Sequence, residues 1–371
     1  MADEKSKATL LKEEIMMKGS KGAATLNAEE IKKADDFCVG YKKFLDHSPV
    51  EREAVSYTLE LAKKAGFTEY DENASYNAGD KVYYVNRDKA IALAVIGKNG
   101  VKNGARLAIA HIDSPRIDLK PNPLYEDTNL ALFKTHYYGG LKKYQWTALP
   151  LSLHGTVVKL DGTKVNITWG DDENESCFCV TDLLPHLAKD QVSKPLAKVF
   201  TGEDLNVLVG SRPYEDGNDE KDLVKLNVMS ILNKKYGIVE GDFLSAELCL
   251  IPSFKARDIG FDASMIGGYG HDDKVCAYPA LMASLDVETP EQTCVTYLTD
   301  KEETGSDGNT GMQSDFLRYF IYDLAKQDGI DGYKALSKST CLSADVSAAY
   351  DPTYACLLYT SPSPRDLSTS R

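Results

Sequence analysis

The sequence lacks an apolar run long enough to cross a membrane, and 27% of its residues are charged. Positive charge is also scarce, because 43 Lys and Arg stand against 56 Asp and Glu, for a formal net charge of -13. Such a chain would repel a phosphate backbone. Its polar, mixed-charge start has no apolar core of a secretory signal. We therefore expect a cytoplasmic protein that binds neither membrane nor nucleic acid.

Cysteines at disulfide-like or zinc-knuckle spacing are missing as well. The eight cysteines are scattered, and most lie inside apolar runs, such as Cys249 between Leu248 and Leu250. That placement is typical of buried thiols in a reducing compartment.

The 371 residues exceed what one ordinary core organises, so we expect two domains. Asn27 with Glu30 predicts a capped first helix, and Ser48 with Pro49 predicts the start of a second. Short buried strands follow, then an alternating β-rich stretch, then α/β patterning again. The expected parts are a catalytic domain at 1–115 and 256–355, a β-rich insertion at 116–255, and an unrelated tail at 356–371, which leaves the catalytic domain incomplete.

Acidic and imidazole side chains follow three of the predicted strands. They are His111 and Asp113 after the strand at 106–110, Glu302 and Glu303 after the strand at 294–298, and Asp345 after the strand at 341–344. Ligands bind at the carboxyl ends of strands in open α/β sheets, so we expect these groups to share one site. Asp272 and Asp273 follow a glycine-rich turn, which could direct a further carboxylate inward.

Zinc binds imidazole nitrogen and carboxylate oxygen, and two neighbouring zinc ions need a bridging carboxylate and a base. The residues supply such a set, with His111 as ligand, Asp113 orienting it and one aspartate of the 272–273 pair as the bridge. Glu302 and Glu303 would divide the roles of base and ligand, because adjacent side chains point in different directions.

Each group taken alone has a simpler explanation. A His-x-Asp sequence is commonly a hydrogen-bonded loop pair, Asp-Asp before a helix is commonly a cap, and Glu-Glu is commonest on a solvated face. Their joint occurrence at strand ends favours the metal site.

Six ordered motifs resemble those of the M18 aspartyl aminopeptidase family. They are His111-Ile112-Asp113-Ser114-Pro115-Arg116, Tyr138-Gly139-Gly140 with Trp146, Leu184-Pro185-His186-Leu187-Ala188, Gly270-His271-Asp272-Asp273-Lys274-Val275, Asp300-Lys301-Glu302-Glu303-Thr304-Gly305-Ser306 and Ser343-Ala344-Asp345. The resemblance implies an α/β zinc-peptidase catalytic domain of the phosphorylase/hydrolase-like kind, interrupted by a β-rich dimerisation domain. It also implies a metalloaminopeptidase with two zinc ions that removes N-terminal Asp or Glu from peptides.

The same resemblance implies a role for each matching residue. His111, Asp272, Glu303 and Asp345 would bind zinc, with Asp272 as the bridge, and Glu302 would be the base. His186 would reach the substrate in a neighbouring subunit of a homo-oligomer, in which dimers assemble into a dodecamer.

The sequence departs from the family pattern at its C-terminal end. The second metal of the family needs a late histidine, whereas the histidines here are His47, His111, His136, His154, His186 and His271. The second site is therefore expected to be incomplete, and whether the chain as written is active is a question for experiment. Two alternatives stay open: a related zinc deacylase or carboxypeptidase, and a shell or scaffold protein without activity.

Overall fold

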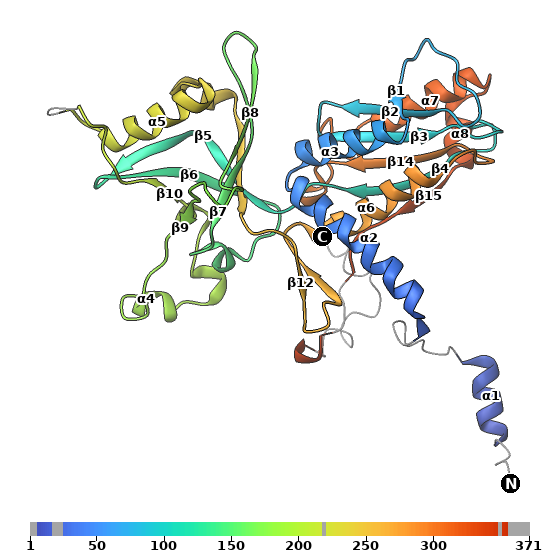
Figure 1. Ribbon diagram of the computed structural model, residues 1–371, viewed down its shortest axis with the longest axis horizontal. Coiled ribbons are helices and arrows are strands. Elements are labelled where there is room, and N and C mark those ends of the chain that lie inside the picture. Colours follow the sequence, from blue (N-terminus) through green and yellow to red (C-terminus); the bar gives the residue numbers. More distant parts are fainter. Residues whose placement is uncertain (1–5, 17–24, 217–219, 348–350, 355–371) are drawn as a thin grey trace.

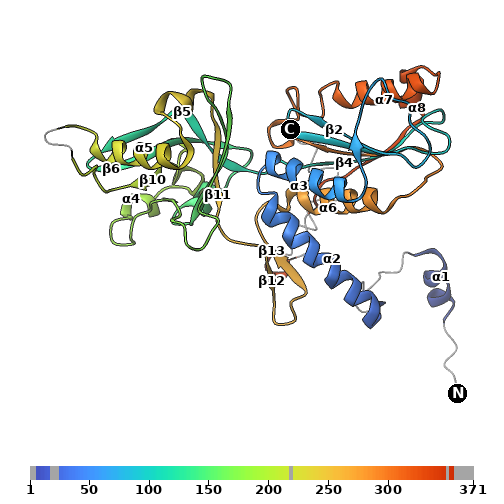
Figure 2. The same cartoon turned by 45° about the horizontal axis from the view of Figure 1, so that its top comes forward.

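The computed structural model describes residues 6–16, 25–216, 220–347 and 351–354, which form two bodies side by side (Figures 1 and 2). The six-stranded sheet of the α/β body takes its strands from both sides of the stretch that forms the β-rich body. The predicted α/β class is confirmed. The domain boundaries stay predictions, and the whole predicted tail at 356–371 lies, like residue 355, outside the described residues. Among the described helices, none is long and apolar enough to cross a membrane.

Strands of the α/β sheet stand in the order β1-β2-β3-β14-β4-β15. Their bounds are β1 Thr68–Glu69, β2 Lys81–Asn86, β3 Ala90–Val95, β4 Arg106–His111, β14 Cys294–Thr299 and β15 Thr340–Ser343. The central strand β3 is buried on both faces, as its unbroken apolar sequence predicts. Its alternate side chains feed two cores: Ile91, Leu93 and Val95 join one, and Ala90, Ala92 and Ala94 join the other.

Helices cover both faces of this sheet (Figure 2). One face packs against α2 (Ala28–His47), α3 (Glu51–Lys64) and α6 (His271–Asp286). The other packs against α7 (Phe316–Gln327) and α8 (Gly332–Lys338). A short helix α1 (Lys7–Ile15) precedes them and buries none of its residues.

The two helix starts predicted from sequence had different outcomes. The Asn27 capping box is confirmed, because its side chain accepts from the Glu30 amide and Glu30 accepts from the Asn27 amide. The predicted start at Ser48-Pro49 is wrong. Ser48 ends α2, and Val50 precedes α3 without a side-chain cap. Only three residues separate these helices, and it is the backbone amide of Ser48 that donates to the Leu45 carbonyl at the end of α2.

The β-rich body is a seven-stranded sheet in the order β8-β7-β11-β5-β6-β10-β9. Its strands are β5 Arg116–Asp127, β6 Leu130–Tyr138, β7 Leu151–Val158, β8 Lys164–Trp169, β9 Cys179–Val180, β10 Val207–Gly210 and β11 Glu247–Pro252. The helix α5 (Leu223–Tyr236) packs on one face of this sheet, and the short α4 (Lys189–Val192) lies at its end (Figure 1). A small hairpin of β12 (Arg257–Ile259) and β13 (Met265–Gly267) leads back to the α/β body.

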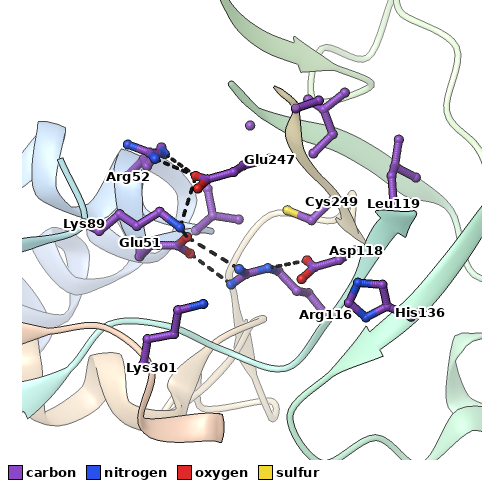
Figure 3. A pocket seen from close by; sticks show the side chains of 14 residues that line it. Glu51, Arg52, Lys89, Arg116, Asp118, Leu119, His136, Glu247, Cys249 and Lys301 are labelled. Carbon is purple, nitrogen blue, oxygen red and sulfur yellow. Dashed lines mark hydrogen bonds and ion pairs between the residues drawn. The ribbon is translucent and has the colours of Figure 1, made fainter. Parts of the chain in front are cut away.

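A buried ion-pair network joins the two bodies (Figure 3). Glu51 at the start of α3 accepts from Arg116 at 2.9 Å and lies 3.2 Å from the ammonium of Lys89. Lys89 also pairs with Glu247 of β11 at 3.1 Å. Burial would raise the pKa of Glu51, but the charges of Arg116 and Lys89 lower it to about 2. The junction is thus held by fully paired charges.

Candidate active site

Three parallel strand ends bring the predicted residues together. β14 and β15 both pair in parallel with β4, and the registers align Thr299 with His111 and Ser343 with Ile109. The chain segments that follow these three strands therefore leave the sheet on the same side, at the carboxyl ends of the strands. His111 ends β4, and Asp345 lies two residues after β15.

His111 is buried and held at both ring nitrogens. Its Nδ1 lies 3.0 Å from the Asp113 carbonyl oxygen and 3.2 Å from an Asp113 carboxylate oxygen. Its Nε2 lies 3.1 Å from Asp272 Oδ1 and 3.7 Å from Glu302 Oε2. Burial lowers the pKa of His111, but the hydrogen bonds to Asp113 and Asp272 outweigh it and raise the pKa to about 11.

Asp113 is completely buried and ties the imidazole to the acidic turn. Its carboxylate accepts from the backbone amides of Glu302 and Glu303, each at 3.2 Å, and from the hydroxyl of Tyr138 at 2.7 Å. Burial works to raise the pKa of Asp113, yet the hydrogen bonds from His111 and Tyr138 keep it lowered. Asp113 is therefore an ionised anchor for the groups around it.

The acidic turn after β14 has a sharply bent backbone. Lys301 and Gly305 have left-handed φ angles of 70° and 96°, and a short 3-10 turn, Glu302–Thr304, lies between them. Burial and the nearby carboxylates raise the pKa of Glu303 to about 7, and they also raise the pKa of Glu302. The Glu302 side chain is 45% exposed, so water can reach it.

The two aspartates at the start of α6 have different surroundings. Asp272 faces the His111 ring with its side chain half exposed. Asp273 is completely buried, and burial raises its pKa to about 6. Of the two, only Asp272 thus directs its carboxylate toward the His111 ring, where a metal ion would bind.

One donor set in the described part of the chain fits a metal ion. The three ligand atoms, one each from His111, Asp272 and Asp345, all lie within 4.8 Å of one another. One imidazole nitrogen and two carboxylate oxygens match the donors zinc takes in hydrolases, and three protein ligands leave a coordination position open. Glu303 lies close enough to Asp272 and His111 for their charges to affect its pKa, so it can serve as a ligand at a neighbouring metal position.

The sequence motifs gave no role to Ser114 and Lys274, which support the backbone of Asp272. The buried Lys274 ammonium donates to Ser114 Oγ at 2.7 Å, and Ser114 Oγ donates to the Asp272 carbonyl at 3.0 Å. Gly270 makes room for this pair, because a Cβ there would lie 2.7 Å from the Lys274 nitrogen, and its φ is +80°. The one sequence signal was the Gly-x-Asp-Asp-Lys spacing.

Tyr138 and Gly139 also surround the site, although they belong to the β-rich body. A Cβ at Gly139 would lie 2.7 Å from Glu303 Oε2, and the residue has a φ of +72°. Glycine therefore lets this backbone approach the carboxylate closely. The Tyr138-Gly139-Gly140 motif was visible in the sequence, but its contact with the acidic turn was not.

His186 is the one predicted site residue that the structure does not bring to this cluster. It lies in an exposed loop just before α4 in the β-rich body. Figure 1 shows α4 at the far end of that body, away from the α/β sheet.

Comparisons with known proteins agree on one family. A family profile described as aminopeptidase I zinc metalloprotease (M18) matches residues 44–363. A probable M18 family aminopeptidase 1 of Clostridium acetobutylicum is 50% identical over 322 residues, covering 85% of this chain and 69% of the relative. The crystal structure of an M18 family aminopeptidase from Thermotoga maritima superposes with a TM-score of 0.86 at 40% identity, covering 91% of this chain and 74% of that one. The yeast mApe1 dodecamer, 20% identical, shares the fold with a TM-score of 0.69, covering 87% of this chain and 74% of that one.

Proposed function

The chain belongs to the M18 family of zinc aminopeptidases, and we propose that His111, Asp272 and Asp345 hold one of its zinc ions. The observation that carries this assignment is the convergence of these three donors within 4.8 Å. A second zinc ion would share the Asp272 carboxylate and would take Glu303 as a further ligand. When bound, zinc supplies Lewis acidity, which polarises a peptide carbonyl and makes water a better nucleophile.

Glu302 is the general base in this proposal. Its Oε2 takes a proton from the attacking water and passes it to the leaving amine, so that water and a peptide become a free amino acid and a shortened peptide. Two observations support the role: the carboxylate lies 3.7 Å from His111 Nε2, and its side chain is open to solvent. Burial raises its pKa, which makes it a better proton acceptor once ionised.

Asp113 acts on the reaction without touching the substrate. It holds His111 in one orientation from below and fixes the backbone of the Glu302-Glu303 turn through two amides. A carboxylate behind a metal-binding imidazole fixes the ring and raises its basicity.

The substitution Glu302→Gln tests the base. It keeps the size of the side chain and should leave zinc content unchanged, while turnover of aminoacyl amides falls by roughly 10²–10⁴-fold. Glu303→Gln is the matched control, because loss of a ligand should reduce zinc content as well. Retained turnover in Glu302→Gln would disprove the assignment.

Acidic N-terminal residues are the proposed substrate preference, and the proposal rests on the resemblance alone. A panel of Asp, Glu, Leu and Lys aminoacyl amides measures it, and N-acetylated versions of the same amides separate an aminopeptidase from a deacylase. Equal turnover of all four free-amine substrates would refute the preference.

We also propose that the protein forms a homo-oligomer of dimers up to a dodecamer, in which His186 reaches the site of a neighbouring subunit. The shared fold with the yeast dodecamer and the exposed position of His186 support this reading. Mass photometry gives the assembly, and His186→Ala should lower turnover only in the assembled protein. A fully active monomer would exclude the role of His186.

A further inference from the structure

Tyr138 is a residue of the β-rich body that contacts the proposed active site within the same chain. It ends β6, in the sheet of the part that the resemblance identifies as a dimerisation domain. Its hydroxyl donates to Asp113 at 2.7 Å, and both residues are buried. Within the described residues, no other side-chain hydroxyl donates a hydrogen bond to the Asp113 carboxylate.

The position of Tyr138 follows from strand register. β5 begins at Arg116, three residues after Asp113, and β5 and β6 pair antiparallel so that Arg116 lies opposite Tyr138. The Cα atoms of residues directly opposite in an antiparallel pair lie about 4.5–5.5 Å apart. The strand pair therefore delivers the tyrosine to the point where the chain leaves the α/β body.

Two cations hold the tyrosine ring in place. The guanidinium of Arg116 lies 4.1 Å from the ring centroid, and the ammonium of Lys301 lies 5.3 Å from it. Arg116 is itself fixed by Glu51 at 2.9 Å and Asp118 at 2.8 Å, within the network between the bodies (Figure 3). Both cations also line a polar cleft of about 210 Å³.

We propose that Tyr138 is a positioning residue for the metal site, acting through Asp113. Its hydrogen bond fixes the carboxylate that orients His111 and carries the amides of Glu302 and Glu303. The β-rich body thereby completes the active site of its own chain, besides any role in assembly. This inference rests on the proposed zinc site.

The substitution Tyr138→Phe removes only the hydroxyl and keeps the ring that Arg116 covers. Zinc affinity of the metal-depleted full chain, measured by competition with a chromophoric chelator, should fall roughly 10–100-fold, as for other residues that orient metal ligands. In the zinc-loaded protein kcat should fall while KM stays unchanged, because Tyr138 is buried and acts through Asp113 in this proposal. Tyr137→Phe is the matched control, since that neighbouring side chain is 47% exposed on the other face of β6.

A double-mutant cycle with Asp113→Asn separates positioning from a general loss of structure. If Tyr138 acts through Asp113, Tyr138→Phe has little further effect on zinc affinity in the Asp113→Asn background. An effect of equal size in both backgrounds overturns the inference, even if Tyr138→Phe also lowers the thermal midpoint. Unchanged zinc affinity and kcat in Tyr138→Phe overturn it as well. A wild-type chain that binds no zinc would instead overturn the proposed function, and the inference with it.

Discussion

We predict that loss of the proton from His154 at alkaline pH weakens the contact between the two bodies. It lies in β7, is buried, and sits between two carboxylates from different parts of the fold. Its Nδ1 lies 3.0 Å and 3.1 Å from the Glu53 oxygens of α3, and its Nε2 lies 3.2 Å from Asp171 and 3.0 Å from Ser152 Oγ. A neutral imidazole has one N–H and can serve only one carboxylate, whereas the protonated ring serves both.

Burial lowers the pKa of His154, but the hydrogen bonds to Asp171 and Glu53 outweigh it and raise the pKa from 6.5 to about 9. That rise corresponds to roughly 3 kcal/mol of stabilisation of the folded state. Because the folded pKa is the higher one, the contribution is complete below pH about 6.5, the unfolded value, and is lost as pH rises through about 9.

Urea unfolding of wild type and His154→Gln between pH 6 and 10 measures this contribution. The free energy of unfolding of wild type should fall across the window by roughly 3 kcal/mol more than that of the variant. His136→Gln is the control, because that histidine is exposed and has no carboxylate partner in the described residues. Parallel pH curves for wild type and His154→Gln would refute a protonated His154 in the folded protein.

Three further substitutions test other contacts. Asp345→Asn should weaken zinc binding at least about 10-fold in a chelator competition, while its unfolding free energy stays within about 0.5 kcal/mol, because the side chain is exposed. Gly139→Ala should lower turnover about 10-fold, because a Cβ there would displace the Glu303 carboxylate, and zinc-loaded kinetics measure the loss. Glu51→Gln should lower the free energy of unfolding by about 3 kcal/mol in urea titration, because it removes the buried carboxylate charge that pairs with both Arg116 and Lys89.

Local patterns predicted the parts of the fold that depend on neighbouring residues. The Asn27 capping box and the buried strand β3 need only a few adjacent side chains, and both were predictable. Ser48 was misassigned because α2 ends there and α3 begins three residues later, at Glu51, without a side-chain cap that the sequence could have indicated.

Sequence alone was enough to identify the donors of the site: an imidazole and acidic groups placed at the ends of buried strands, with glycines beside them. Their shared location follows from parallel pairing of β14 and β15 with β4. Tertiary structure alone decided which aspartate of the 272–273 pair faces His111 and which is buried. It also decided that Tyr138 meets Asp113, because that contact depends on the register of β5 against β6 and on the docking of two bodies, which no local pattern encodes.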